Sequence, residues 1–115
     1  MAFHDLERKK IENTLNAFID KIRPAPHFRS NLDFDFEISG QSIELVEIRP
    51  QWDNKSIIRR QAFAKATFVK TQGVWKVYWL RASGKWKNYE PASTALSVDD
   101  FLATVKTDEY GCFFG

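Results

Sequence analysis

The chain has 115 residues, enough for one domain with a sizeable core, and its 43% hydrophobic and 15% aromatic residues exclude a disordered polypeptide. A formal net charge of +2 does not make the molecule as a whole a polyanion-binding protein. A single cysteine excludes an intramolecular disulfide, and no apolar run approaches the roughly 18 residues that a membrane span needs. We therefore expect one domain over residues 1–115, in the cytoplasm and without a membrane partner.

The first expected element is a helix over residues 5–23. Ile11, Leu15 and Phe18 recur at the spacing of one helical face. Asp5 is expected to cap its start, and Pro24 to end it, because a proline disfavours helical geometry in the residue before it.

A hairpin follows, with strands over residues 32–38 and 42–49. Apolar and acidic residues alternate strictly in the first strand, and Gly40 with Gln41 suits a two-residue turn. Only this register keeps the apolar side chains on one face, and it sets Glu37 opposite Glu44. A bulge is expected where Leu45 and Val46 interrupt the alternation, and Pro50 is expected to end the second strand.

Three more strands are expected over residues 60–70, 74–81 and 85–90, after a loop over residues 51–55. Turns at 71–73 and 82–84 close on glycine, and the first of these pairs Lys70 with Val74. Ala62, Ala64 and Ala66 are expected to share one face of their strand. The strand over residues 74–81 is apolar on both faces, so it is expected to be central and covered on both sides, at least in part.

The last helix is expected from Ser97, its cap, to Lys106. The predicted fold class is α+β: an N-terminal helix, a five-stranded antiparallel meander and a short C-terminal helix, in cystatin-like or roll-like packing.

Positive charge is concentrated in the middle of the chain. Residues 54–89 hold nine basic residues and no acidic one, which leaves eight basic and fifteen acidic residues elsewhere. Basic and aromatic side chains together are typical of surfaces that hold single-stranded nucleic acid. The expected contacts with nucleic acid or another anionic partner are the charges of Lys76, Arg81, Lys85 and Lys87, with Trp86 as the stacking residue.

The plainer alternative is that most of the tryptophans belong to the core and the lysines are its solvated edge. A second alternative is that Lys65, Arg59 or Arg60 simply neutralises the acidic first hairpin. Phosphate neutralisation supplies most sequence-independent affinity, so a net charge of +2 predicts weak, salt-sensitive binding.

The carboxylates of the first hairpin suggest an enzymatic alternative. Asp35, Glu37 and Glu44 would share a face, where like charges repel and need compensation. A divalent metal beside Lys65 would make a hydrolase-like site, whereas charge pairing or solvation requires no chemistry. No metal motif is present, so we expect no cofactor, no catalytic residue and no enzyme active site.

The apolar tail over residues 110–115 has two interpretations. It packs on the chain's own core, or it forms the interface of a homodimer.

Seven segments resemble a family of small bacterial proteins catalogued as domain of unknown function 3024. They are EIRP (47–50), KATFVKT (65–71), WKVYW (75–79), RA (81–82), KW (85–86), YEP (89–91) and GCF (111–113). The likeness extends over nearly the whole chain and implies a bacterial, cytoplasmic protein. It assigns no activity and no role to any residue.

Overall fold

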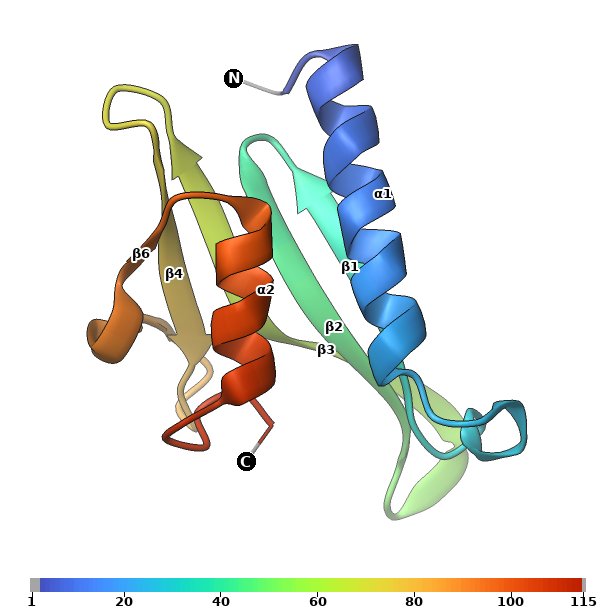
Figure 1. Ribbon diagram of the computed structural model, residues 1–115. Coiled ribbons are helices and arrows are strands. Elements are labelled where there is room, and N and C mark those ends of the chain that lie inside the picture. The colour runs from blue at the N-terminus through green and yellow to red at the C-terminus, as the bar shows by residue number, and fades with distance from the viewer. Residues whose placement is uncertain (1–2, 115) are drawn as a thin grey trace.

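A computed structural model describes residues 3–114 and confirms the α+β class (Figure 1). The elements in chain order are α1 (Asp5–Ile22), η1 (Pro26–Phe28), β1 (Asp33–Ser39), β2 (Ser42–Gln51), β3 (Asn54–Val69), β4 (Val74–Leu80), β5 (Trp86–Asn88), η2 (Glu90–Ala92), β6 (Thr94–Ala95) and α2 (Val98–Thr107). The two short 3₁₀ turns, η1 and η2, and the two-residue strand β6 were not expected from the sequence.

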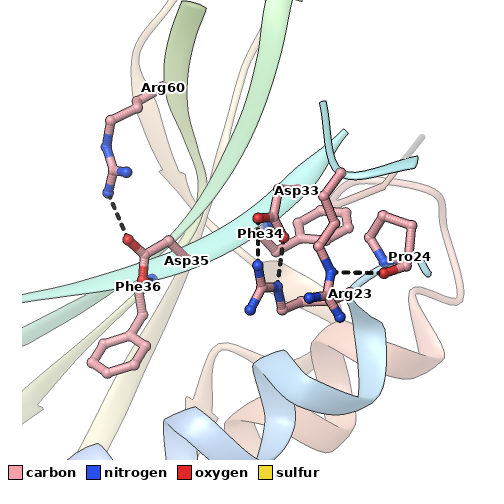
Figure 2. Close-up of polar contacts among 8 residues, drawn as sticks. Arg23, Pro24, Asp33, Phe34, Asp35, Phe36 and Arg60 are labelled. Carbon is pink, nitrogen blue, oxygen red and sulfur yellow. Dashed lines mark hydrogen bonds and ion pairs between the residues drawn. The ribbon is translucent and has the colours of Figure 1, made fainter. Parts of the chain in front are cut away.

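Helix α1 buries the predicted stripe and ends before Pro24, where Arg23 is already extended. Asp5 is not the cap: His4 occupies that position without a side-chain hydrogen bond, and Asp5 lies in the first helical turn. The Arg23 guanidinium donates two hydrogen bonds of 2.7 Å to the carboxylate of Asp33 (Figure 2). This pair fastens the end of α1 to the first residue of β1.

The strands form one antiparallel sheet in the order β1–β2–β3–β4–β5, and β6 pairs with β4 beside β5. Both helices lie on the same face of this sheet (Figure 1). The core fills the space between them, with Leu15 and Phe101 from the helices packed in one cluster with Ile43, Ala66 and Val77 from three strands. We call the opposite sheet face, which neither helix covers, the open face.

The β1–β2 hairpin has the predicted two-residue turn and places Glu37 opposite Glu44. The predicted bulge also exists, but its extra residue is Phe63 on β3: Leu45 pairs with Ala64, and Val46 pairs with Ala62. The expected alanine face is therefore wrong. The bulge turns Ala62 away from Ala64, because one inserted residue reverses the side-chain alternation.

Strands β2 and β3 extend well past the rest of the sheet. Pro50 does not end β2, and the expected loop over residues 51–55 is only a tight turn at Trp52 and Asp53. Strand β1 pairs with β2 only as far as Ile48, so beyond that point β2 is an edge strand. A proline is tolerated there because an edge strand can leave one amide position without a ladder hydrogen bond.

The β3–β4 connection has four residues, not three. Val69, not Lys70, pairs with Val74, and Gly73 closes the turn with φ of 65°. The loop is longer because the amides of Gln72 and Gly73 both donate to the carbonyl of Val69. This one-residue difference decides which β3 side chains share a face with those of β4.

Helix α2 begins as predicted, with the Ser97 hydroxyl accepting a hydrogen bond from the Asp100 amide. Beyond its end the tail folds back on the same chain. The Asp108 carboxylate accepts hydrogen bonds from the Phe113 and Phe114 amides, and Phe113 is buried beside Tyr89.

Candidate functional site

One row of side chains crosses the open face from β1 to β5. Glu37, Glu44, Lys65, Tyr78 and Asn88 are successive cross-strand partners, and residues opposite one another in an antiparallel pair share a face. The neighbouring row includes Ile43, Ala66 and Val77, which are buried under the helices. Alternation therefore directs the charged row away from the core.

Lys65 lies at the centre of this face between two aromatic rings. Its Nζ atom is 5.0 Å from the centre of the Tyr78 ring and 5.1 Å from that of Trp86. Both rings belong to half-buried side chains, so part of each remains open to solvent. An ammonium over aromatic rings is attracted by their negative faces. This attraction holds the Lys65 charge beside two rings on which a base could stack.

The predicted binding residues do not all lie together. Lys76 and Trp86 are on the open face, as shown by their pairing with Thr67 and Leu80. Arg81 and Lys85 are exposed in the turn between β4 and β5. Lys87 pairs with Trp79, whose side chain packs against the core, so Lys87 belongs to the helix side, where it lies 3.9 Å from a Glu90 carboxylate oxygen.

Several basic residues around this cluster form no ion pair in the described part of the chain. Among the ion pairs within residues 3–114, none involves Lys65, Lys76, Arg81 or Lys85. The other half of the open face differs. There Arg60 lies 3.1 Å from an Asp35 oxygen (Figure 2). It also lies 3.3 Å from a Glu37 oxygen. The hydrogen bond to Asp35 is the main cause of the raised pKa of Arg60.

Two of the three proposed ligands of the alternative metal site form ion pairs with Arg60. Asp35 and Glu37 both pair with that guanidinium, which is the charge compensation expected for facing carboxylates. Within the described residues, no group of three or more metal-ligating side chains lies close enough to hold a cation. Glu44 instead faces Lys65 across the strands.

The four tryptophans occupy four different environments. Trp75 is buried, Trp79 packs against the core, and Trp86 borders the open face. Trp52, at the tip of the β2–β3 hairpin, is 90% exposed. The interpretation that most tryptophans are core residues therefore holds for Trp75 and Trp79, two of the four.

Lys65 and Tyr78 were not among the predicted contacts with nucleic acid. The signal was present in their types, a lysine and a tyrosine on adjacent strands. The expected three-residue loop, however, pairs Lys65 with Trp79 and so puts Tyr78 on the other face.

Comparison with known proteins gives one result. A family model described as Domain of unknown function (DUF3024) matches residues 3–115. No curated protein and no solved structure matches the chain. Among the described helices, none combines the length and the apolar composition needed to cross a membrane.

Proposed function

The chain belongs to the DUF3024 family, whose description names no activity, and we propose that it binds single-stranded nucleic acid on the open face of β3, β4 and β5. The observation that carries the proposal is the cluster of unpaired cations around Tyr78 and Trp86 on a face without a covering helix. The single cysteine favours a reducing setting, and we place this activity in the bacterial cytoplasm.

Stacking supplies the first part of the interaction. The ammonium of Lys65 now occupies the exposed ring faces, a contact worth about 0.5–1 kcal/mol at an exposed site. A stacked base contributes about 1–3 kcal/mol, so an incoming base can displace the ammonium with a net gain. The displaced Lys65 then remains within the same strand row to contact a phosphate.

Charge supplies the second part and limits its strength. Lys65, Lys76, Arg81 and Lys85 are four cations near this surface that take part in none of the ion pairs within residues 3–114. Four phosphate contacts with a single strand give a slope of about −3 in the logarithm of the association constant against that of the salt concentration. Glu37 and Glu44 repel phosphate from the β1–β2 half, so the strand is confined to β3–β5.

Fluorescence anisotropy with labelled single-stranded DNA and RNA, at several salt concentrations, tests this proposal. Lys76→Glu should weaken binding about tenfold at low salt, because one contact is lost and one repulsion is gained. Lys9→Glu is the matched control: it makes the same charge change at an exposed position on α1. Flat titrations at both low and high salt, or equal losses in the two variants, contradict the proposal.

A homodimer through the open face is the second candidate, favoured by the division of charge across that face. Carboxylates lie on β1 and β2, whereas unpaired cations lie on β3 and β4. Two copies related by a two-fold axis can place each half against its opposite. The mass in solution should then double at low salt and return to that of a monomer at high salt. A dimer formed through the tail would instead need residues 110–115, and Phe113 of this segment is buried in its own chain.

A further inference from the structure

The paired ends of β2 and β3 extend beyond the strands that pair with them on either side. We call residues 49–59 the arm; Figure 1 shows its pale green turn at the lower right, beyond the C-terminal end of α1. Strand β1 pairs with β2 only up to Ile48, and β4 pairs with β3 only from Ala64 onward. Between those limits the two strands of the arm have only each other as partners.

Large apolar side chains are exposed on this arm. Trp52 at the tip is 90% exposed, and Ile57 and Ile58 are 45% and 57% exposed. Near the tip the ladder is irregular, with Pro50 opposite Ile58 but Gln51 opposite Asn54. Residues 55–57 therefore have no cross-strand partner in the ladder and form an irregularity in β3. Three large apolar groups on one thin projection contribute nothing to the core and mark a contact surface.

Most of the charged residues in the arm are basic. Its single acidic residue, Asp53, accepts a hydrogen bond from the Gln51 side-chain amide, and Arg49 pairs with Glu47 at 2.6 Å. No ion pair among residues 3–114 involves Lys55 or Arg59. Arg59 makes only a long contact of 3.4 Å with the Gln51 side-chain oxygen. Two cations near an exposed indole are thus free for an anionic partner.

We propose that the arm enters a groove of a nucleic-acid duplex adjoining the single strand held on the open face; this inference rests on the proposed function. A two-stranded β-ribbon has the width that the major groove of a duplex admits. Exposed apolar side chains can enter between base pairs, and cations beside them contact the flanking phosphates. Trp52 is the wedge, and Lys55 and Arg59 are the phosphate contacts. The preferred ligand is then a junction between a single strand and a duplex.

The test compares a short labelled single-stranded oligonucleotide with the same oligonucleotide joined to a hairpin stem. The wild-type chain should bind the stem-containing ligand about tenfold more tightly, the gain expected from one stacked aromatic and two phosphate contacts. Trp52→Ala, and separately Lys55→Glu with Arg59→Glu, should remove this gain and leave single-strand affinity unchanged. Leu96→Ala is the matched control, since Leu96 is 79% exposed and lies outside the arm.

The outcomes separate the two proposals. The role of the arm is overturned if the chain binds the single strand but the stem adds no affinity, or if the added affinity persists in Trp52→Ala. Either result is compatible with binding on the open face. A stem-dependent, Trp52-dependent signal without single-strand binding overturns the open face and supports the arm. Binding of neither ligand overturns both. The duplex assignment is also overturned if the chain shows no preference for the stem but binds vesicles of anionic phospholipid in a Trp52-dependent way. The arm would then be a membrane-binding segment.

Discussion

The Arg23–Asp33 pair shows how two side chains join separate elements. Its hydrogen bonds lower the pKa of the Asp33 carboxyl, with the Arg23 side chain as the largest cause and the Phe34 amide as a further one. The Asp33 side chain is only 18% exposed, so solvent screens the pair incompletely. The pair therefore ties stability to the ionisation of one carboxyl group.

The first prediction concerns pH. Because the folded pKa of Asp33 lies below its unfolded value, the pair stabilises the fold above about pH 4, and this contribution is lost as pH falls through the folded pKa. Asp33→Asn should lower the urea midpoint at neutral pH and flatten its decline in acid. Glu109→Gln, at an exposed position, is the control. A decline in acid as steep in Asp33→Asn as in the wild type would contradict this role.

The second prediction concerns Glu44, the cross-strand neighbour of Lys65 on the open face. Its carboxylate repels an approaching phosphate, so Glu44→Gln should strengthen single-strand binding several-fold at low salt. The estimate follows from about 1 kcal/mol between unit charges 4 Å apart in water. The gain should shrink as salt is added. Anisotropy titrations measure it, and unchanged affinity at low salt would argue against a strand lying over β3.

At this scale some residue contacts could be predicted from the sequence and others could not. The pairing of Glu37 with Glu44 was predicted because a two-residue turn and strict alternation leave one register. The contact of Lys65 with Trp86 was not, because these residues belong to strands that do not pair directly. It depends on the exact length of the β3–β4 loop.

Among the elements, the tail after α2 depends most on one residue. Asp108 has a left-handed backbone with φ of 42°, and its carboxylate accepts hydrogen bonds of 3.0 and 2.8 Å from the Phe113 and Phe114 amides. This arrangement brings Phe114 against Phe34 and Phe63, with ring centres 6.0 and 5.1 Å away. Asp108 thereby closes one end of the core.

The third prediction tests this closure. Asp108→Ala should lower the free energy of unfolding by about 2–3 kcal/mol, since two amides lose their acceptor and alanine is strained at positive φ. Asp108→Asn should lose less, because asparagine tolerates that backbone and keeps one acceptor oxygen. Urea unfolding followed by circular dichroism measures both. An alanine variant as stable as the asparagine variant would show that the tail is held by its phenyl rings alone.

The arm is the element that sequence patterns described least well. Proline commonly ends a strand, and residues 51–59 lack the alternation of a half-buried strand because neither face of the arm meets a core. The helices and the first hairpin were predicted closely, since each has one buried face and a clear stop signal. Periodicity reports burial, so it cannot reveal a strand that is exposed on both sides.

At the scale of the whole molecule, both helices cover one sheet face and leave the other to charged and aromatic side chains. The β4 pattern predicted at least partial cover on both faces, and on the side away from the helices Lys76 and Tyr78 are only half-buried. Which face a helix covers depends on loop paths and on the bulge at Phe63. Neither is encoded in the pattern of any single strand.

The open face as the binding surface is tested most directly by mapping amide chemical-shift changes in the isotope-labelled chain as single-stranded oligonucleotide is added. The largest changes should fall on Lys65, Lys76, Tyr78 and Trp86 and in the β4–β5 turn, and they should vanish at high salt. The amides of α1 and α2 should change little. Changes centred on the helices, or none at low salt, would contradict the assignment of this face to nucleic acid.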